Sequence, residues 1–252
     1  MIRLASLLFV LLLASSVPGG CPSPCPVAYA DQQYTREQLV TMYPGFYFFR
    51  GPGEVPKVAL TFDDGPDDQM TPQILDILKE NSVHATFFLI GSYARQNPNM
   101  VRRIVAEGNV IANHTWSHAN MLRLPPGQAR QEITRTEDLL AQITGCRTAL
   151  LRPPRGRVSP DIMDLARQEG YRVIGWSVDS VDWLDPVKSR ITARLHDQMH
   201  PGAIILMHAV DLPTSKGVTV KVLPGLIREL KARGYQLVTL DELLQVPAYG
   251  SP

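Results

Sequence analysis

The stretch KVALTFDDGP, residues 57–66, is an apolar run that ends in two adjacent carboxylates and a Gly-Pro pair. The run predicts a buried β-strand over residues 57–62, and Gly-Pro predicts a turn directly after it. Asp63 and Asp64 therefore stand where the strand stops. A turn needs only one Asp to bond its own backbone, so the pair indicates chemistry only if other ligand-type residues converge on it.

Strand-like and helix-like segments alternate along the rest of the chain. Further strands are predicted at residues 84–90, 109–113, 149–151, 171–178, 202–207 and 235–240. Two of the intervening helices are predicted to begin with an N-cap and a proline, at Thr71-Pro72 and Ser159-Pro160. This alternation favours a distorted (β/α) barrel of about seven parallel strands, with an open doubly wound α/β sheet as the alternative.

The composition leaves room for one sizeable core and shows no strong field of charge. The chain has 252 residues, 44% of them hydrophobic, and 25 Lys and Arg balance 24 Asp and Glu to a net charge of +1. We therefore expect no nucleic-acid partner, and the sequence implies no protein partner. Cys146 is the single thiol of the main domain, so we expect it to be a packing residue and not part of a disulfide framework.

The amino terminus has the features of an export signal. Arg3 precedes an apolar run over residues 4–14, which is short for a membrane span and fits a secretory signal. Residues 28–30 read Ala-Tyr-Ala, which predicts cleavage after Ala30, while lipidation at Cys21 and an uncleaved anchor are alternatives. We expect an exported protein, secreted or associated with the cell envelope. The predicted segments are the signal or anchor (1–30), an amino-terminal extension (31–56), the main domain (57–245) and a tail (246–252).

Polar and ionisable side chains follow five of the predicted strands. Functional residues of (β/α) barrels lie at the carboxyl ends of the strands, so these groups share one predicted rim. Each has an ordinary explanation by itself, such as a surface cation for Arg152 or a packing role for Trp183. Their joint occurrence predicts a site. The groups are Asp63 and Asp64, HTWSH (114–118), RPPRG (152–156), DSVDW (179–183) and His208.

The residue types in this set suit hydrolysis by a metal-bound water. His114 and His118 are four residues apart and can reach one ion, and two His with one carboxylate leave coordination positions open, as in catalytic sites. A second carboxylate must then act as general base, and a separate group must protonate the leaving group. The two adjacent Asp residues are accordingly expected to have different roles, one binding the metal and the other taking the proton from the water.

Residues 57–245 resemble the polysaccharide deacetylases with a NodB homology domain, carbohydrate esterase family 4. All five motifs of that family occur in order. They are TFDDGP (61–66), HTWSH (114–118), RPPRG (152–156), DSVDW (179–183) and LMH (206–208). The resemblance implies that Asp63 is the general base. It also implies a divalent metal, zinc or cobalt, held by Asp64, His114 and His118.

The same resemblance implies roles for the remaining motif residues. Arg152 would orient the base, and His208 would be the general acid with Asp182 as its partner. The backbone N–H of Arg155 would help to hold the oxyanion, while Trp183 would form part of the groove wall and Leu206 would contribute to substrate binding. Two positions depart from the family pattern. Arg155 stands where Tyr is common, and Ala209 stands where Asp often follows the last His, with Asp211 two residues further on.

The expected function is a metal-dependent hydrolase that removes N-acetyl groups from N-acetylglucosamine-type residues of an extracellular polysaccharide, peptidoglycan or chitin-like, and releases acetate. An O-deacetylating esterase of the acetylxylan type and a catalytically silent carbohydrate-binding module are the alternatives. The silent module is disfavoured because sugar binding needs neither a spare base nor an acid. The cations Arg152, Arg155 and Arg157 lead us to favour a carboxylate-bearing cell-wall glycan, since a guanidinium grips a carboxylate with two hydrogen bonds.

Overall fold

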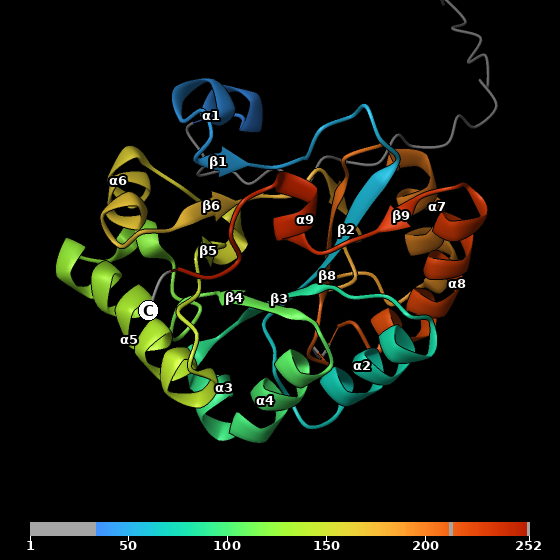
Figure 1. The fold of residues 1–252 in the computed structure, drawn as a ribbon, viewed down its shortest axis with the longest axis horizontal. Helices are drawn as coiled ribbons and strands as arrows, with labels where there is room; N and C mark the ends of the chain where they lie inside the picture. The colour runs from blue at the N-terminus through green and yellow to red at the C-terminus, as the bar shows by residue number, and fades with distance from the viewer. Residues whose placement is uncertain (1–33, 212–213, 251–252) are drawn as a thin grey trace, which may run out of the picture. The chain divides into compact units, whose positions relative to one another are not determined.

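The computed structural model describes residues 34–211 and 214–250 (Figure 1). The predicted signal or anchor segment, with Cys21 and the cleavage position after Ala30, lies outside the described residues. None of the helices within the described ranges has the length and apolar content that crossing a membrane requires.

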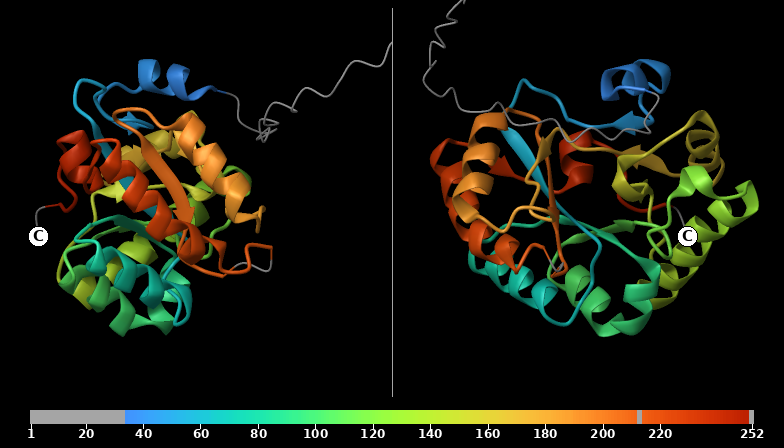
Figure 2. Two further views of the ribbon diagram at one scale, coloured as in Figure 1. Left: turned by 90° about the vertical axis from the view of Figure 1, so that its right-hand side faces the viewer. Right: turned by 180° about the vertical axis from the view of Figure 1, so that it is seen from behind.

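The described strands form one parallel sheet that curls into a distorted barrel, with the helices around its outside (Figures 1 and 2). Its order is β1-β6-β5-β4-β3-β2-β8-β7, and β9 also pairs with β2. The prediction of a distorted (β/α) barrel is confirmed. The strands are β1 (Tyr47–Phe48), β2 (Lys57–Asp63), β3 (Thr86–Leu89), β4 (Val110–Asn113), β5 (Leu150–Leu151), β6 (Arg172–Ile174), β7 (Val178–Asp179), β8 (Ile204–His208) and β9 (Gln236–Leu237).

The predicted single strand over residues 171–178 was wrong, because the structure divides it into β6 and β7 at the two sides of the barrel opening. The Gly175 N–H bonds to β1 at 2.7 Å, and the Ser177 N–H bonds to β8 at 3.1 Å. Gly175 permits this path because a Cβ there would lie 2.5 Å from the hydroxyl of Tyr47. Gly175 is the signal that could have indicated the break, since an isolated glycine inside a strand pattern indicates a bulge or a close backbone approach.

Helices cover the outer face of the barrel (Figure 2), and the described part of the amino-terminal extension contributes α1 and β1 to the same compact unit. The tail also packs on it, since Tyr249 forms an antiparallel bridge with Thr148. The helices are α1 (Arg36–Met42), α2 (Met70–Glu80), α3 (Gly91–Gln96), α4 (Pro98–Ala106), α5 (Pro126–Thr144), α6 (Pro160–Gln168), α7 (Lys188–Gln198), α8 (Val218–Ala232) and α9 (Leu240–Leu244), with 3₁₀ turns η1 (Met121–Arg123) and η2 (Pro154–Gly156).

One of the two predicted N-caps is correct. The Ser159 side chain accepts the Ile162 N–H at the start of α6. The predicted cap at Thr71 was wrong, because Asp67 accepts three backbone N–H groups at the start of α2 instead. The Thr71 hydroxyl donates to the carbonyl of Ala209 at 2.9 Å, so it links α2 to the residue after β8.

Alternation along β2 decides which side chains face the barrel interior. Leu60 and Phe62 belong to the apolar cluster that β2 shares with α2 and α8. Thr61 and Asp63 point the other way and contact Arg152 inside the barrel. The strand therefore delivers one carboxylate to the interior at the edge where it ends.

Candidate active site

Both carboxylates of the opening motif reach one site because the chain leaves strand geometry between them. Asp63 is the last residue of β2 and is 4% exposed. In a continuing strand the next side chain would point to the opposite face. Asp64 instead has a φ of 71°, in the left-handed region, and is 9% exposed. Such a conformation costs a non-glycine residue about 1–3 kcal/mol, so the surrounding fold must hold it in place.

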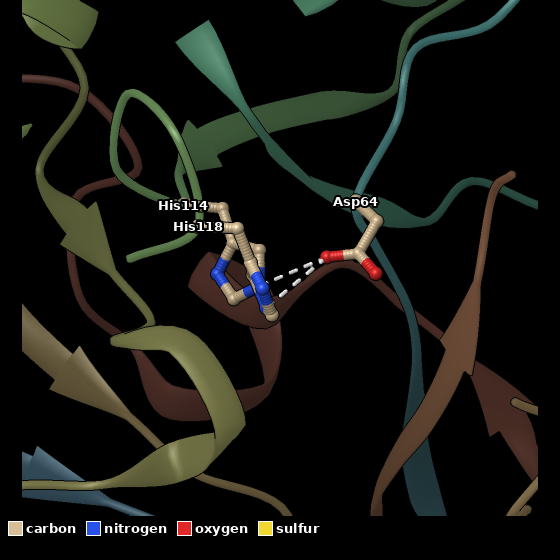
Figure 3. Close-up of side chains that lie close together, drawn as sticks. All are labelled: Asp64, His114 and His118. Carbon is tan, nitrogen blue, oxygen red and sulfur yellow. Dashed lines mark ion pairs between the residues drawn. The ribbon is translucent and has the colours of Figure 1, made fainter. Parts of the chain in front are cut away.

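Asp64, His114 and His118 form a cluster that could hold a metal ion (Figure 3). Their three ligand atoms lie within 4.8 Å of one another. Nε2 of His114 is 3.3 Å from Asp64 Oδ1, and Nε2 of His118 is 3.5 Å from the same oxygen. That oxygen is buried and has no hydrogen-bond partner. A buried acceptor without a donor, faced by two imidazole nitrogens, fits a divalent cation.

The protonation behaviour of this cluster suits a cation. Burial acts to raise the pKa of Asp64, but contact with His114 and the charge of His208 outweigh it and hold the pKa below its ordinary value. Burial and the charge of His114 lower the pKa of His118 to about 4, so its imidazole is neutral, as a ligand must be. Burial also acts to lower the pKa of His114, but Asp63 and Asp64 raise it above the ordinary value. Cation binding would therefore displace a proton from His114.

A backbone carbonyl orients the imidazole of His114. Its Nδ1 lies 2.6 Å from the carbonyl oxygen of Arg152, so the Nδ1–H donates there and Nε2 is left to face Asp64. This is the usual arrangement of a metal-binding histidine, whose second nitrogen is held by an outer partner. The backbone of Arg152 is in turn bonded to the carbonyl of Asn113 at 3.0 Å.

Arg152 is fully buried and fixes the orientation of Asp63. One of its guanidinium nitrogens donates to Asp63 Oδ1 at 2.6 Å and to Thr61 Oγ1 at 2.9 Å. Its other nitrogens donate to the carbonyls of Ile174 and Gly175, so the buried charge is well satisfied. Burial lowers the pKa of Arg152 despite Asp63. The second oxygen of Asp63 is left 3.7 Å from His114 Nε2, at the metal cluster.

His208 and Asp182 form a second charged pair. His208 ends the neighbouring strand β8, where it pairs in register with Asp63, and Asp182 follows β7 and is fully buried. Asp182 Oδ1 lies 2.7 Å from His208 Nδ1, and its Oδ2 accepts the His208 backbone N–H at 2.9 Å and the Thr219 hydroxyl. Burial acts to lower the pKa of His208, but Asp182 outweighs it and raises that pKa to about 10. Burial acts to raise the pKa of Asp182, but the contact with His208 outweighs it and lowers that pKa. His208 is thus a charged imidazolium with a proton to give.

The three residues expected at the substrate groove occupy different surroundings. Arg155 is exposed at the rim with a φ of 61°, and its charge contributes to the lowered pKa of His118. Trp183 follows Asp182 directly and is partly exposed. Leu206 is only 3% exposed and lies two residues before His208 on the same face of β8, so it lies beneath the site.

The departure at Ala209 leaves the site geometry intact. Ala209 is fully buried, its methyl group lies against Gly65, and its N–H bonds to the carbonyl of Asp63 at 2.8 Å. Asp211 does not take over a site position. It accepts hydrogen bonds from the Gly217 N–H at 2.7 Å and the Ser215 hydroxyl at 3.1 Å, which stabilise the segment before α8.

The structure also brings in residues that the sequence analysis missed. Thr61 contacts Arg152, and Thr219 contacts Asp182. Asn113 contacts the backbone of the loop between His114 and His118, which we call the histidine loop. Thr61 could have been found, because it precedes Asp63 by two positions on one strand face. Asn113 directly precedes His114. Thr219 is far from Asp182 in sequence, and nothing in its local pattern indicates the contact.

Comparisons with known proteins agree with this geometry. A family model described as "Polysaccharide deacetylase" matches residues 50–174. A peptidoglycan-N-acetylglucosamine deacetylase of Bacillus cereus is 40% identical over 199 residues, covering 79% of this chain and 72% of that protein. A chitooligosaccharide deacetylase of Bradyrhizobium sp. is 36% identical over 198 residues, covering 74% and 90%. The crystal structure of a peptidoglycan N-acetylglucosamine deacetylase in complex with 4-naphthalen-1-yl-N-oxidanyl-benzamide has a TM-score of 0.80 and 37% identity, covering 85% of this chain and 99% of that one.

Proposed function

Because the chain belongs to the polysaccharide deacetylase family, we propose that it is a metal-dependent N-deacetylase. Its substrate is an extracellular polysaccharide with N-acetylglucosamine-type residues, and its products are acetate and a free amine. The observation that carries this proposal is the arrangement around the metal cluster. An oriented carboxylate, Asp63, lies on one side of the cluster, and the imidazolium of His208 ends the adjacent strand.

The residues support a division of labour in amide hydrolysis. An ion held by Asp64, His114 and His118, with Zn²⁺ expected and Co²⁺ as the alternative, would supply a water of lowered pKa and polarise the amide carbonyl. Asp63, fixed by Arg152, takes the proton of the attacking water.

Bond cleavage then depends on Arg155 and His208. The backbone N–H of Arg155 donates to the oxyanion that forms when the water oxygen bonds to the carbonyl carbon. His208, kept charged by Asp182, gives its proton to the nitrogen as the carbon–nitrogen bond breaks. The acetyl group leaves as acetate, and the sugar keeps the amine.

The named relatives support a cell-wall or chitin-like glycan as the substrate, because they are called peptidoglycan-N-acetylglucosamine and chitooligosaccharide deacetylases. Such a polymer lies outside the cytoplasm, so we propose that residues 1–30 direct export, with cleavage after Ala30 or retention as an anchor. Residues 57–245 are the proposed catalytic domain.

Metal content and acetate release together test the proposal. The purified protein should retain about one Zn²⁺ or Co²⁺ per chain and release acetate from N-acetylglucosamine oligomers. Chelation should abolish this activity, and added metal should restore it. Release of acetate from acetylated xylan alone would favour the O-deacetylating esterase. Sugar binding without acetate release from either polymer would identify a silent binding module.

A further inference from the structure

A buried chain of hydrogen bonds connects the loop between the two histidines to helix α5. The Thr115 N–H donates to Asn113 Oδ1 at 2.9 Å, and Asn113 Nδ2 donates to the Tyr171 hydroxyl at 2.9 Å. The Tyr171 hydroxyl donates in turn to the carboxyl group of Glu137. All four residues are buried. None of them takes part in the proton transfers described above.

The histidine loop needs such support because its backbone is strained. Thr115 has a φ of 68° and His118 a φ of 58°, and a β-branched residue rarely adopts the left-handed region. The bond from Asn113 to the residue two positions on is an Asx turn, which sets the direction in which the chain leaves β4. The side chain of His118 is 29% exposed, against 1% for His114. Packing thus fixes His118 less, and its position depends more on the backbone.

Only one orientation of the Asn113 side-chain amide satisfies all of its hydrogen bonds. Besides the Tyr171 hydroxyl, its Nδ2 donates to the carbonyl of Ile133 in α5 at 3.0 Å. Tyr171 presents a lone pair to Asn113 because its own proton is directed to Glu137. The Asn113 oxygen is therefore left to face the Thr115 N–H.

Glu137 is the far end of the network and is itself held firmly. It is 4% exposed and accepts the Thr148 N–H at 2.8 Å, together with the hydroxyls of Thr148 and Tyr171. Burial and the neighbouring Glu137 raise the pKa of Tyr171, so the phenol keeps its proton. The network joins α5, the residue before β6 and the end of β4.

We propose that Glu137 and Tyr171 are positioning residues for the metal site, acting through Asn113 on the loop that carries His118. The proposal rests on the proposed metal-dependent function. It goes beyond that function by assigning three residues that neither bind the ion nor touch the reacting atoms.

Metal affinity tests this role, with a matched control whose hydroxyl also contacts β4. Tyr171→Phe removes only the hydroxyl. Tyr249→Phe is the control, because its hydroxyl meets the Ile111 N–H of β4 at 3.3 Å without joining the network. Competition of each protein with a chelator gives the dissociation constant for Zn²⁺. We expect about threefold to tenfold weaker binding in Tyr171→Phe, about tenfold to hundredfold in Asn113→Ala, and no change in Tyr249→Phe.

Two further readouts separate positioning from loss of stability. The Co²⁺ absorption spectrum should change in Tyr171→Phe and Asn113→Ala at temperatures where both are folded, and remain as in the wild type in Tyr249→Phe. Glu137→Ala should weaken Zn²⁺ binding as Tyr171→Phe does, and Glu137→Gln, which keeps an acceptor oxygen, should recover part of the loss.

A double variant tests whether Tyr171 acts through Asn113. Adding Tyr171→Phe to Asn113→Ala should not weaken Zn²⁺ binding further, because the link is already broken. Additive losses would overturn this route. Unchanged Zn²⁺ affinity and Co²⁺ spectrum in Tyr171→Phe, with only a lower unfolding temperature, would make the network a structural one. A wild-type protein that binds neither ion would overturn the proposed function together with this inference.

Discussion

The charge of Asp182 should set the alkaline limit of activity through His208. Asp182→Asn keeps the shape and one acceptor oxygen, which can still face Nδ1 of His208, but it removes the charge that favours the imidazolium. It also places an amide donor where Oδ2 accepts the His208 N–H and the Thr219 hydroxyl. Raising the pKa of His208 from 6.5 to about 10 corresponds to about 5 kcal/mol in favour of the charged form. An opposite charge in contact accounts for about 1 to 3 pKa units, so the variant should have its alkaline limit lower by that amount.

The assay is the pH dependence of kcat/KM, which reports the free enzyme. His208 must be protonated to donate, so activity is present below its pKa and is lost as the pH rises through it. A cation in the cluster acts to lower this pKa in both proteins, so the difference between them remains. The kcat/KM of Asp182→Asn relative to the wild type should therefore be modestly reduced near neutral pH and fall steeply at higher pH.

The free energy of unfolding should also decrease as the pH rises. The pKa of His208 is higher in the folded protein than in the unfolded chain, so the pairing stabilises the fold fully below about pH 6.5. This contribution declines as the pH rises toward 10. Asp182→Asn should show a shallower loss of unfolding free energy over that window, measured by denaturant unfolding at several pH values.

Asp185→Asn provides a matched control for the pH profile. Asp185 is also an aspartate and lies three residues after Asp182, but it pairs with Arg190 and Arg194 of α7 and not with His208. The control should retain the alkaline limit of the wild type. An alkaline limit that is the same in Asp182→Asn and the wild type would refute the reasoning and remove His208 as the acid.

Three further predictions follow from the site. Asp64→Ala and His114→Ala should lose both metal and turnover, whereas His208→Ala should keep its metal and lose turnover; metal analysis decides this, and the reverse pattern would exchange the roles. Arg152→Met should destabilise the fold by about 3–5 kcal/mol, because it leaves the carboxylate of Asp63 buried without its cation, and denaturant unfolding measures this. Arg155→Tyr should lower activity selectively on peptidoglycan fragments relative to chitooligosaccharides, with the difference shrinking in salt; an equal effect on both substrates would contradict a carboxylate contact.

The sequence was sufficient for the fold class and for the set of residues on the rim. Parallel strands end at one edge, so side chains that follow different strands must meet there. The register of β2 with β8 brings Asp63 opposite His208 as this reasoning requires. The location of the metal cluster followed from the same rule, and its three residues lie together in the structure.

Contacts between distant segments were not predictable in the same way. Thr219 reaches Asp182 from α8, and Tyr171 reaches Asn113 from the position before β6, yet neither residue differs in type or local pattern from a packing residue. The cap of α2 illustrates the same limit. Thr71 before Pro72 has the sequence of an N-cap, but the free N–H groups at the start of α2 donate to the side chain of Asp67 instead.

The backbone at the rim explains why turn chemistry alone could not reveal the site. A turn that needs a positive φ is predicted from a glycine in the sequence, because glycine adopts a positive φ without strain. Eight described non-glycine residues have a positive φ, and five of them are site residues or direct neighbours of site residues: Asp64, Thr115, His118, Arg155 and Val181. Such a conformation costs about 1–3 kcal/mol at each position. At Asp64 and His118 glycine would relieve the backbone but could not supply the carboxylate or the imidazole. The adjacent Asp63 and Asp64 can thus serve one cleft only because the surroundings hold Asp64 in a left-handed conformation directly after the strand that ends at Asp63.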